Sequence, residues 1–178
     1  MAYTKHVKRQ EVMNMITFQG KEVHLRHKRL NVNDTLPSFT IVKNDLSEIK
    51  SDDTKGIRVF LSVPSLDTGV CSMEVAKFMQ YFQGDQKLTC YAISMDLPFA
   101  LDRWCQAKEN DNIITTSDYK YQSFGQLTGT IIDELNLLTR AVFVVDENNV
   151  LQYVEYVSEI TNEPDYDAVL NKIAQLTR

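Results

Sequence analysis

The residues with the clearest capacity for chemistry are three cysteines, Cys71, Cys90 and Cys105. Cys71 ends the stretch PSLDTGVC (64–71), where the β-branched run IRVFLSV (57–63) gives way to apolar residues at helical spacing. This pattern predicts that Cys71 lies in the first turn of a helix, where unpaired N–H groups and the helix dipole favour negative charge. Because the thiolate is the reactive form of cysteine, Cys71 is a candidate nucleophile.

A buried, unreactive thiol is the alternative, since protein cores commonly contain free cysteines. Spacing alone leaves both interpretations of Cys71 open. Asp67 or Thr68 is well suited to cap the predicted helix, and Gly69 permits close approach of the backbone. Thr68 precedes Cys71 by three residues, so its hydroxyl could donate to the sulfur or to a substrate oxygen. Cys90 lies inside the strand pattern LTCYAISM, which predicts a buried, protonated thiol with a structural role.

Composition excludes several other classes of function. An odd number of cysteines fits a disulfide framework poorly, and the absence of a C-x-x-C pair argues against a zinc ribbon or a thioredoxin-type dithiol. His24 and His27 lie in a strand-like stretch and would face opposite sides, so no metal and no cofactor is expected. The net charge of −5 argues against nucleic acid and anionic membranes as partners. No apolar segment suits a membrane span or a signal peptide, so we expect a cytoplasmic protein.

Hydrophobic periodicity predicts the elements that would position these residues. We expect strands at 39–42, 57–63, 88–95 and 112–118, and hairpins within 15–26 and 140–157. Helices are predicted from Cys71 to near Gly84 and over 164–176, with Pro164 in the first turn, whereas 96–109 is predicted to be a loop with one or two helical turns. Strands and helices in the order β-α-β, then β-β-α, indicate an α/β sheet with helices on both faces.

Three stretches together resemble a known family. Pro64, Thr68 and Cys71 fit the pattern P-x-x-x-T/S-x-x-C of peroxiredoxins. FLSVPSLDTGVCSMEVAKF, AISMDLPFALDRWCQAKE and RAVFVVDENN resemble the thiol peroxidase subgroup, the atypical two-cysteine peroxiredoxins. The similarity runs from about Met15 to the end of the chain. It implies a thioredoxin-like fold in one domain over 15–178, with a central mixed sheet and an N-terminal β-hairpin. Residues 1–14 are expected to be a flexible extension.

The resemblance also implies a role for each site residue. Cys71 would be the peroxidatic cysteine, which attacks a hydroperoxide and becomes a sulfenic acid. Thr68 would hydrogen-bond the thiolate and the peroxide, Pro64 would shield the sulfur, and Arg140 would stabilise the charge that develops on the departing oxygen. Cys105 would be the resolving cysteine and form an intramolecular disulfide with Cys71, which thioredoxin would reduce. The subgroup's habit suggests a homodimer.

Two hypotheses of function follow from this pattern. The first is a thioredoxin-dependent peroxidase for hydrogen peroxide and alkyl hydroperoxides, acting in antioxidant defence. The second is a redox sensor or relay module that passes oxidation to a partner protein. The first is favoured, because a thiol, a hydroxyl, an arginine and a second cysteine that could close the cycle all occur in the chain.

Overall fold

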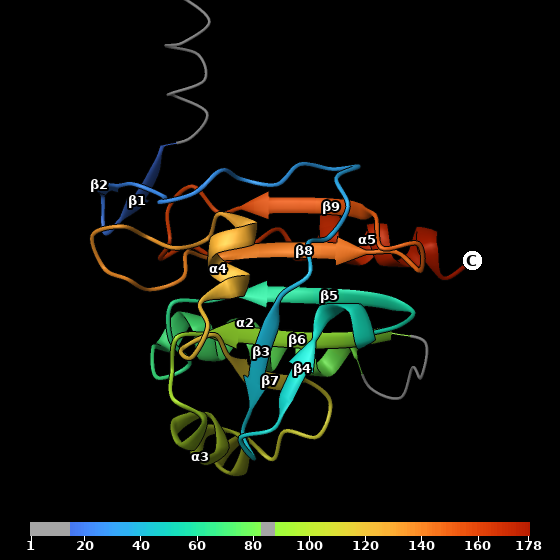
Figure 1. Cartoon of the computed structure of the whole chain (residues 1–178), viewed down its shortest axis with the longest axis horizontal. Helices are drawn as coiled ribbons and strands as arrows, with labels where there is room; N and C mark the ends of the chain where they lie inside the picture. Colours follow the sequence, from blue (N-terminus) through green and yellow to red (C-terminus); the bar gives the residue numbers. More distant parts are fainter. Residues whose placement is uncertain (1–14, 83–87) are drawn as a thin grey trace, which may run out of the picture.

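A mixed sheet forms the centre of the computed structural model, which describes residues 15–82 and 88–178 (Figure 1). The seven strands of this sheet lie in the order β4-β3-β7-β6-β5-β8-β9. β5 pairs in parallel with β6, and β6 with β7, whereas the other neighbours are antiparallel. The strands are β3 (Thr40–Lys43), β4 (Glu48–Lys50), β5 (Ile57–Ser62), β6 (Leu88–Ser94), β7 (Ile114–Ser117), β8 (Ala141–Val145) and β9 (Leu151–Tyr156).

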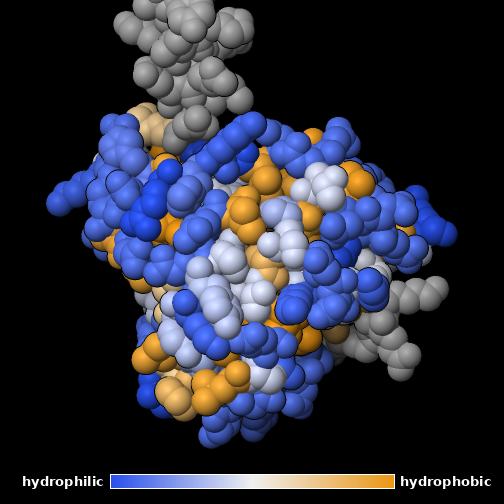
Figure 2. Space-filling view, viewed as in Figure 1, coloured by the Kyte–Doolittle hydropathy of each residue, from blue (hydrophilic) through white to orange (hydrophobic). Residues whose placement is uncertain are grey.

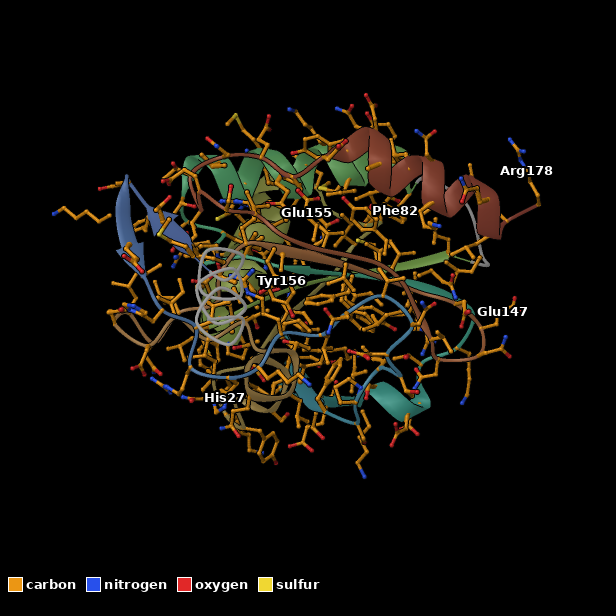
Figure 3. All side chains as sticks on the ribbon, turned by 90° about the horizontal axis from the view of Figure 1, so that it is seen from above. His27, Phe82, Glu147, Glu155, Tyr156 and Arg178 are labelled. Carbon is orange, nitrogen blue, oxygen red and sulfur yellow. The ribbon has the colours of Figure 1, made fainter. Side chains whose placement is uncertain are left out.

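The central strands are apolar on both faces because helices or loops cover both sides of the sheet. Val59 and Leu61 of β5 face one hydrophobic cluster, whereas Phe60 between them faces the other. The same alternation continues in β9, where Figure 3 shows Glu155 and Tyr156 on opposite sides of the sheet. The central strands β5, β6 and β8 therefore contribute to two cores, and the β-branched run at 57–63 matches this position.

Three helices cover one face, namely α2 (Gly69–Tyr81), α3 (Pro98–Lys108) and α5 (Tyr166–Leu176). Figure 3 shows α2 and α5 side by side above the sheet. α4 (Ser123–Thr128) packs on the opposite face through the buried ring of Phe124 and lies in front of the sheet in Figure 1. The predicted mixed sheet with helices on both faces is confirmed.

The predicted N-terminal hairpin is formed by β1 (Ile16–Phe18) and β2 (Lys21–Val23). Gln19 and Gly20 form its turn, both with positive φ (53° and 74°), as a two-residue hairpin of the type I′ class requires. The predicted extension over 1–14 and the predicted helix end near Gly84 lie outside the described residues. No helix in the part of the chain that the structure describes is both long and apolar enough to cross a membrane.

Three local predictions were wrong. Residues 98–108 form a complete helix rather than a loop, because Pro98 occupies its first turn and Leu101 and Trp104, three residues apart, reach the core. Pro164 precedes the α5 cap instead of lying in its first turn, and the side chain of Asp165 accepts from Ala168 N at 3.0 Å. The strand predicted through the two histidines ends at Val23.

Candidate active site

Cys71 is the third residue of α2, and its side chain is almost fully covered at 1% exposed. β5 ends at Ser62, and the chain turns through the buried Pro64 before α2 begins. Thr68 is the N-cap residue, with extended backbone angles (φ −93°, ψ 146°) and no side-chain capping hydrogen bond. The sulfur of Cys71 therefore lies in the first helical turn, where backbone N–H groups lack helical partners.

The pairing of β5 with β8 brings Arg140 to this turn. Ser62 at the end of β5 pairs with Ala141, so Arg140, one residue before β8, lies beside the segment that leads to Cys71. The Ser62 hydroxyl also donates to Thr139 O at 2.8 Å, which ties the two segments together. Arg140 Nη2 donates to Cys71 Sγ at 3.3 Å. The sheet register thus joins two residues that are 69 positions apart in sequence.

Arg140 is 2% exposed, and each nitrogen of its planar guanidinium donates a hydrogen bond. Its Nε donates to Ile160 O at 2.9 Å, and its Nη1 donates to Glu74 Oε2 in a buried ion pair. Burial lowers the pKa of the Arg140 guanidinium, but attraction by Glu74 and Cys71 outweighs it, and the net direction is upward. Arg140 therefore remains a cation beside the sulfur.

Glu74 is a site residue that the sequence did not indicate. It lies one helical turn after Cys71, and its side chain is 0% exposed. Burial raises the pKa of the Glu74 carboxyl to about 7, although the Arg140 cation opposes that shift. Glu74 Oε1 is one of the buried oxygens of the described residues that have no hydrogen-bond partner. Cys71 and Glu74 thus share one guanidinium.

The Thr68 hydroxyl is on the exposed side of the turn. It donates to Ser65 O at 2.9 Å. A hydroxyl carries one hydrogen, so donation to the Cys71 sulfur or to a substrate oxygen requires that this bond be exchanged. The carboxylate of Asp96, which accepts from Ser65 Oγ at 2.7 Å and from Leu66 N at 2.8 Å, holds the preceding part of the loop.

Cys105 lies near the end of α3 and is partly buried against the same hydrophobic cluster as Cys71. Its sulfur is 3.0 Å from Thr115 Oγ1 and 3.5 Å from the side-chain nitrogens of Asn44 and Asn110. All three cysteines are free, so the chain is in its dithiol form. Cys90 is 1% exposed in β6, and burial raises its thiol pKa well above the ordinary value.

One hydrogen bond connects the neighbours of the two cysteines on α2 and α3. Trp104 Nε1, next to Cys105, donates to Ser72 Oγ, next to Cys71, at 3.0 Å. The indole is 7% exposed and belongs to the core between the helices and the sheet. The ends of α2 and α3 that carry the cysteines are therefore anchored to each other as well as to the sheet.

The two histidines that were weighed as metal ligands lie away from this arrangement. His24 Nδ1 is 2.6 Å from Glu134 Oε1, and this contact raises the pKa of the imidazole. His27 is exposed at the surface, on the far side of the sheet from α2 and α5 in Figure 3.

Comparison with known proteins gives a consistent family. The redoxin family model matches residues 31–170. A thiol peroxidase of Oceanobacillus iheyensis is 48% identical over 162 residues, covering 90% of this chain and 99% of its own length. A thiol peroxidase of Clostridium acetobutylicum is 46% identical over 155 residues, covering 87% of this chain and 94% of its own.

Solved structures agree with the sequence relatives. A peroxiredoxin-like protein from Aquifex aeolicus superposes with a TM-score of 0.87 at 35% identity, covering 92% of this chain and 97% of that one. A thiol peroxidase from Chromobacterium violaceum superposes with a TM-score of 0.83 at 17% identity, which supports the fold alone. These matches confirm the resemblance found in the sequence: the chain belongs to the redoxin family, in the thiol peroxidase group of peroxiredoxins, and has their thioredoxin-like fold.

Proposed function

We propose that this protein is a thiol peroxidase that reduces hydrogen peroxide and alkyl hydroperoxides with Cys71 as the peroxidatic residue. The observation that carries the proposal is the hydrogen bond from the buried Arg140 guanidinium to Cys71 Sγ in the first turn of α2. A cation that donates to the sulfur, together with the free N–H groups of the same helical turn, favours the thiolate and the negative charge that spreads over S, O and O as the peroxide bond breaks.

The first step forms an S–O bond and breaks the O–O bond. The Cys71 thiolate attacks the terminal oxygen of ROOH and becomes a sulfenic acid, while the departing oxygen takes a proton and leaves as ROH. Arg140 stabilises the departing oxygen, Thr68 donates to the peroxide once its bond to Ser65 exchanges, and Pro64 keeps water from the sulfur.

The second step forms a disulfide. The Cys105 thiol attacks the Cys71 sulfenic acid, an S–S bond replaces the S–O bond, and the hydroxyl leaves as water with the thiol proton. A thioredoxin dithiol then reduces the disulfide by exchange. Cys105 is suited to this role because α3 packs beside α2, whereas Cys90 is held within a central strand.

A homodimer in the cytoplasm is the form in which we expect the protein to act, with residues 15–178 as one domain. Leu97 and Phe99, at the start of α3, are 53% and 68% exposed, and Met73 of α2 is exposed as well. Figure 2 shows hydrophobic residues at the surface where α3 lies. A second copy would cover these side chains. Sedimentation should therefore give a dimer for the wild type and a monomer for Phe99→Asp.

The test of function is peroxide-dependent NADPH oxidation in the presence of thioredoxin and thioredoxin reductase. Wild-type protein should turn over repeatedly, Cys71→Ser should be inactive, and Cys105→Ser should complete one turnover and stop. Cys90→Ser should still form the disulfide. Activity in Cys71→Ser would refute the assignment, and a single oxidation of the wild type without turnover would favour the redox sensor instead.

A further inference from the structure

A surface pocket of about 260 Å³ opens beside the Cys105 sulfur. It is formed by the end of β3 and the following turn, by α3, and by the segment that leads into β7; its polar lining includes Asn44, Asn110 and Thr115. Among the described residues, these three side chains make the hydrogen bonds to Cys105 Sγ. The sulfur therefore lies among three polar side chains, which we call the seat of Cys105, although α3 also borders the apolar core.

The hydrogen bonds in this seat have a definite direction. Thr115 Oγ1 donates its one hydrogen to Asn44 Oδ1 at 3.0 Å, so the Cys105 thiol must be the donor to Thr115 Oγ1. Asn44 and Asn110 each donate to the sulfur through Nδ2. Asn110 is itself fixed, because its Nδ2 also donates to Ile113 O at 2.7 Å and its Oδ1 accepts from Ile113 N. The thiol thus gives one hydrogen bond and receives two.

We propose that Asn44, Asn110 and Thr115 are positioning residues. They hold the Cys105 thiol in place and so set the rate at which it forms the disulfide with Cys71. This inference rests on the proposed function. Cys105 must leave the seat to reach Cys71, because the contacts of its sulfur point to β7 and the turn after β3. The contacts with Asn44 and Thr115 join α3 to other segments and exist only while Cys105 stays in place, so each one shifts the equilibrium away from the conformation that forms the disulfide, and Asn110, which follows α3, orients the sulfur towards them.

Two reactions, disulfide formation and further oxidation, then compete for the Cys71 sulfenic acid. While Cys105 stays seated, the Cys71 sulfenic acid can meet a second hydroperoxide, whose terminal oxygen oxidises the sulfur to a sulfinic acid as ROH leaves. Weakening the seat should accelerate disulfide formation and reduce this over-oxidation. The first oxidation of Cys71 should not change, because none of the three side chains contacts Cys71 or Arg140 through a hydrogen bond found among the described residues.

Thr115→Val is the direct test, since valine keeps the shape of threonine and removes the acceptor of the thiol hydrogen. Rapid quenching with a thiol-alkylating reagent, followed by mass spectrometry, measures sulfenic acid, disulfide and sulfinic acid separately after hydrogen peroxide is added. We expect disulfide formation to accelerate about two- to tenfold, the range for loss of one neutral hydrogen bond, with an unchanged rate of sulfenic acid formation. Asn44→Ala, a substitution in a turn, should act in the same direction.

Thr116→Val is the matched control. Thr116 is the next residue of β7, fully buried, and its hydroxyl donates to Ala92 O at 3.3 Å instead of contacting Cys105. It should destabilise the protein without accelerating disulfide formation. Equal disulfide rates in wild type, Thr115→Val and Asn44→Ala, or equal acceleration by Thr116→Val, would overturn this inference alone. If the wild type formed no Cys71–Cys105 disulfide, the proposed cycle would fall together with the inference.

Discussion

Replacing Arg140 by methionine should separate the role of the guanidinium in the fold from its role in chemistry. Arg140 joins Cys71, Glu74 and Ile160 O from a position that is 2% exposed. Methionine fills much of the volume but leaves Glu74 without its cation. Because the pKa of this carboxyl is already about 7 beside the cation, Glu74 is about half protonated in the wild type at pH 7, and taking up the rest of the proton adds little to the cost.

The expected loss of stability for Arg140→Met comes from Ile160 O and the Glu74 carboxyl, which lose their donor, and is about 1–3 kcal/mol for each at pH 7. The loss should grow as the pH rises above 7, because Glu74 then ionises beside Arg140 in the wild type but has no cation in the variant. Adding Glu74→Leu should restore most of the stability, since an apolar pair of similar size replaces the ion pair. Urea unfolding measured by the fluorescence of Trp104, the only tryptophan of the chain, gives these values.

Activity should respond differently. Both Arg140→Met and the double variant lose the donor to Cys71, and the rate constant for oxidation by hydrogen peroxide should fall about 10²- to 10³-fold in each. Arg58→Met is the control, because Arg58 is 3% exposed at the opposite end of β5 and donates to Asp146 O at 2.7 Å. It should reduce stability and leave the rate constant unchanged. A double variant that is stable and oxidises at the wild-type rate would refute the catalytic role of Arg140.

Three further outcomes are expected. Burial raises the pKa of the Asp118 carboxyl to about 6, as it raises that of Glu74 to about 7. The folded state then binds more protons than the unfolded state, and the stability this provides is lost as the pH rises through 6 and 7. Unfolding free energies should fall by an amount on the order of 4 kcal/mol between pH 5 and 8, and Asp118→Asn should flatten the curve; a rise would contradict this. Ser72→Ala should leave the Trp104 indole without its acceptor and cost about 1–3 kcal/mol in urea unfolding, with a change in tryptophan emission. An unchanged unfolding midpoint would show that the bond is dispensable. Cys90→Ala should cost about 1–2 kcal/mol for the lost packing in β6 and keep full turnover with thioredoxin; loss of the disulfide would show that Cys90 takes part in it.

Elements that bury a regular apolar pattern were predictable from the sequence. β5 and β6 are continuous apolar runs, and α2 repeats its core residues Val75 and Phe78 at helical spacing. Short elements were not predictable. β4 has three residues, and α4 has six, whose first N–H groups are held by the carboxylate of Asp118 in the loop before the helix, at 3.1 Å from Phe124 N and 2.8 Å from Gly125 N. Such elements depend on tertiary contacts that local propensity does not contain.

The candidate site divides in the same way. Cys71, Thr68 and Pro64 are neighbours in sequence and form one motif, and the resemblance adds Arg140 and Cys105. Glu74 gave no signal, because a glutamate in an amphipathic helix is ordinarily exposed, and its partner is 66 positions away. The seat of Cys105 was equally hidden, since its side chains come from three separate segments. The type of chemistry could be inferred from sequence, whereas the neighbours of Cys71 and Cys105 that we propose to control it could not.

Glu74 gives the site a charge that depends on pH. Cys71 and Glu74 lie one turn apart on α2, so both acidic groups reach the same side of Arg140. When Glu74 is protonated, the guanidinium neutralises only the thiolate. When Glu74 ionises above its pKa of about 7, two anions share one buried cation, and the second negative charge opposes both the thiolate and the charge that develops on the departing oxygen. The orphaned Oε1 of Glu74 is consistent with a carboxyl that the fold does not require to be ionised. The buried ion pair therefore contributes less to stability than its geometry suggests, and under the proposed function its role is to hold the guanidinium against Cys71.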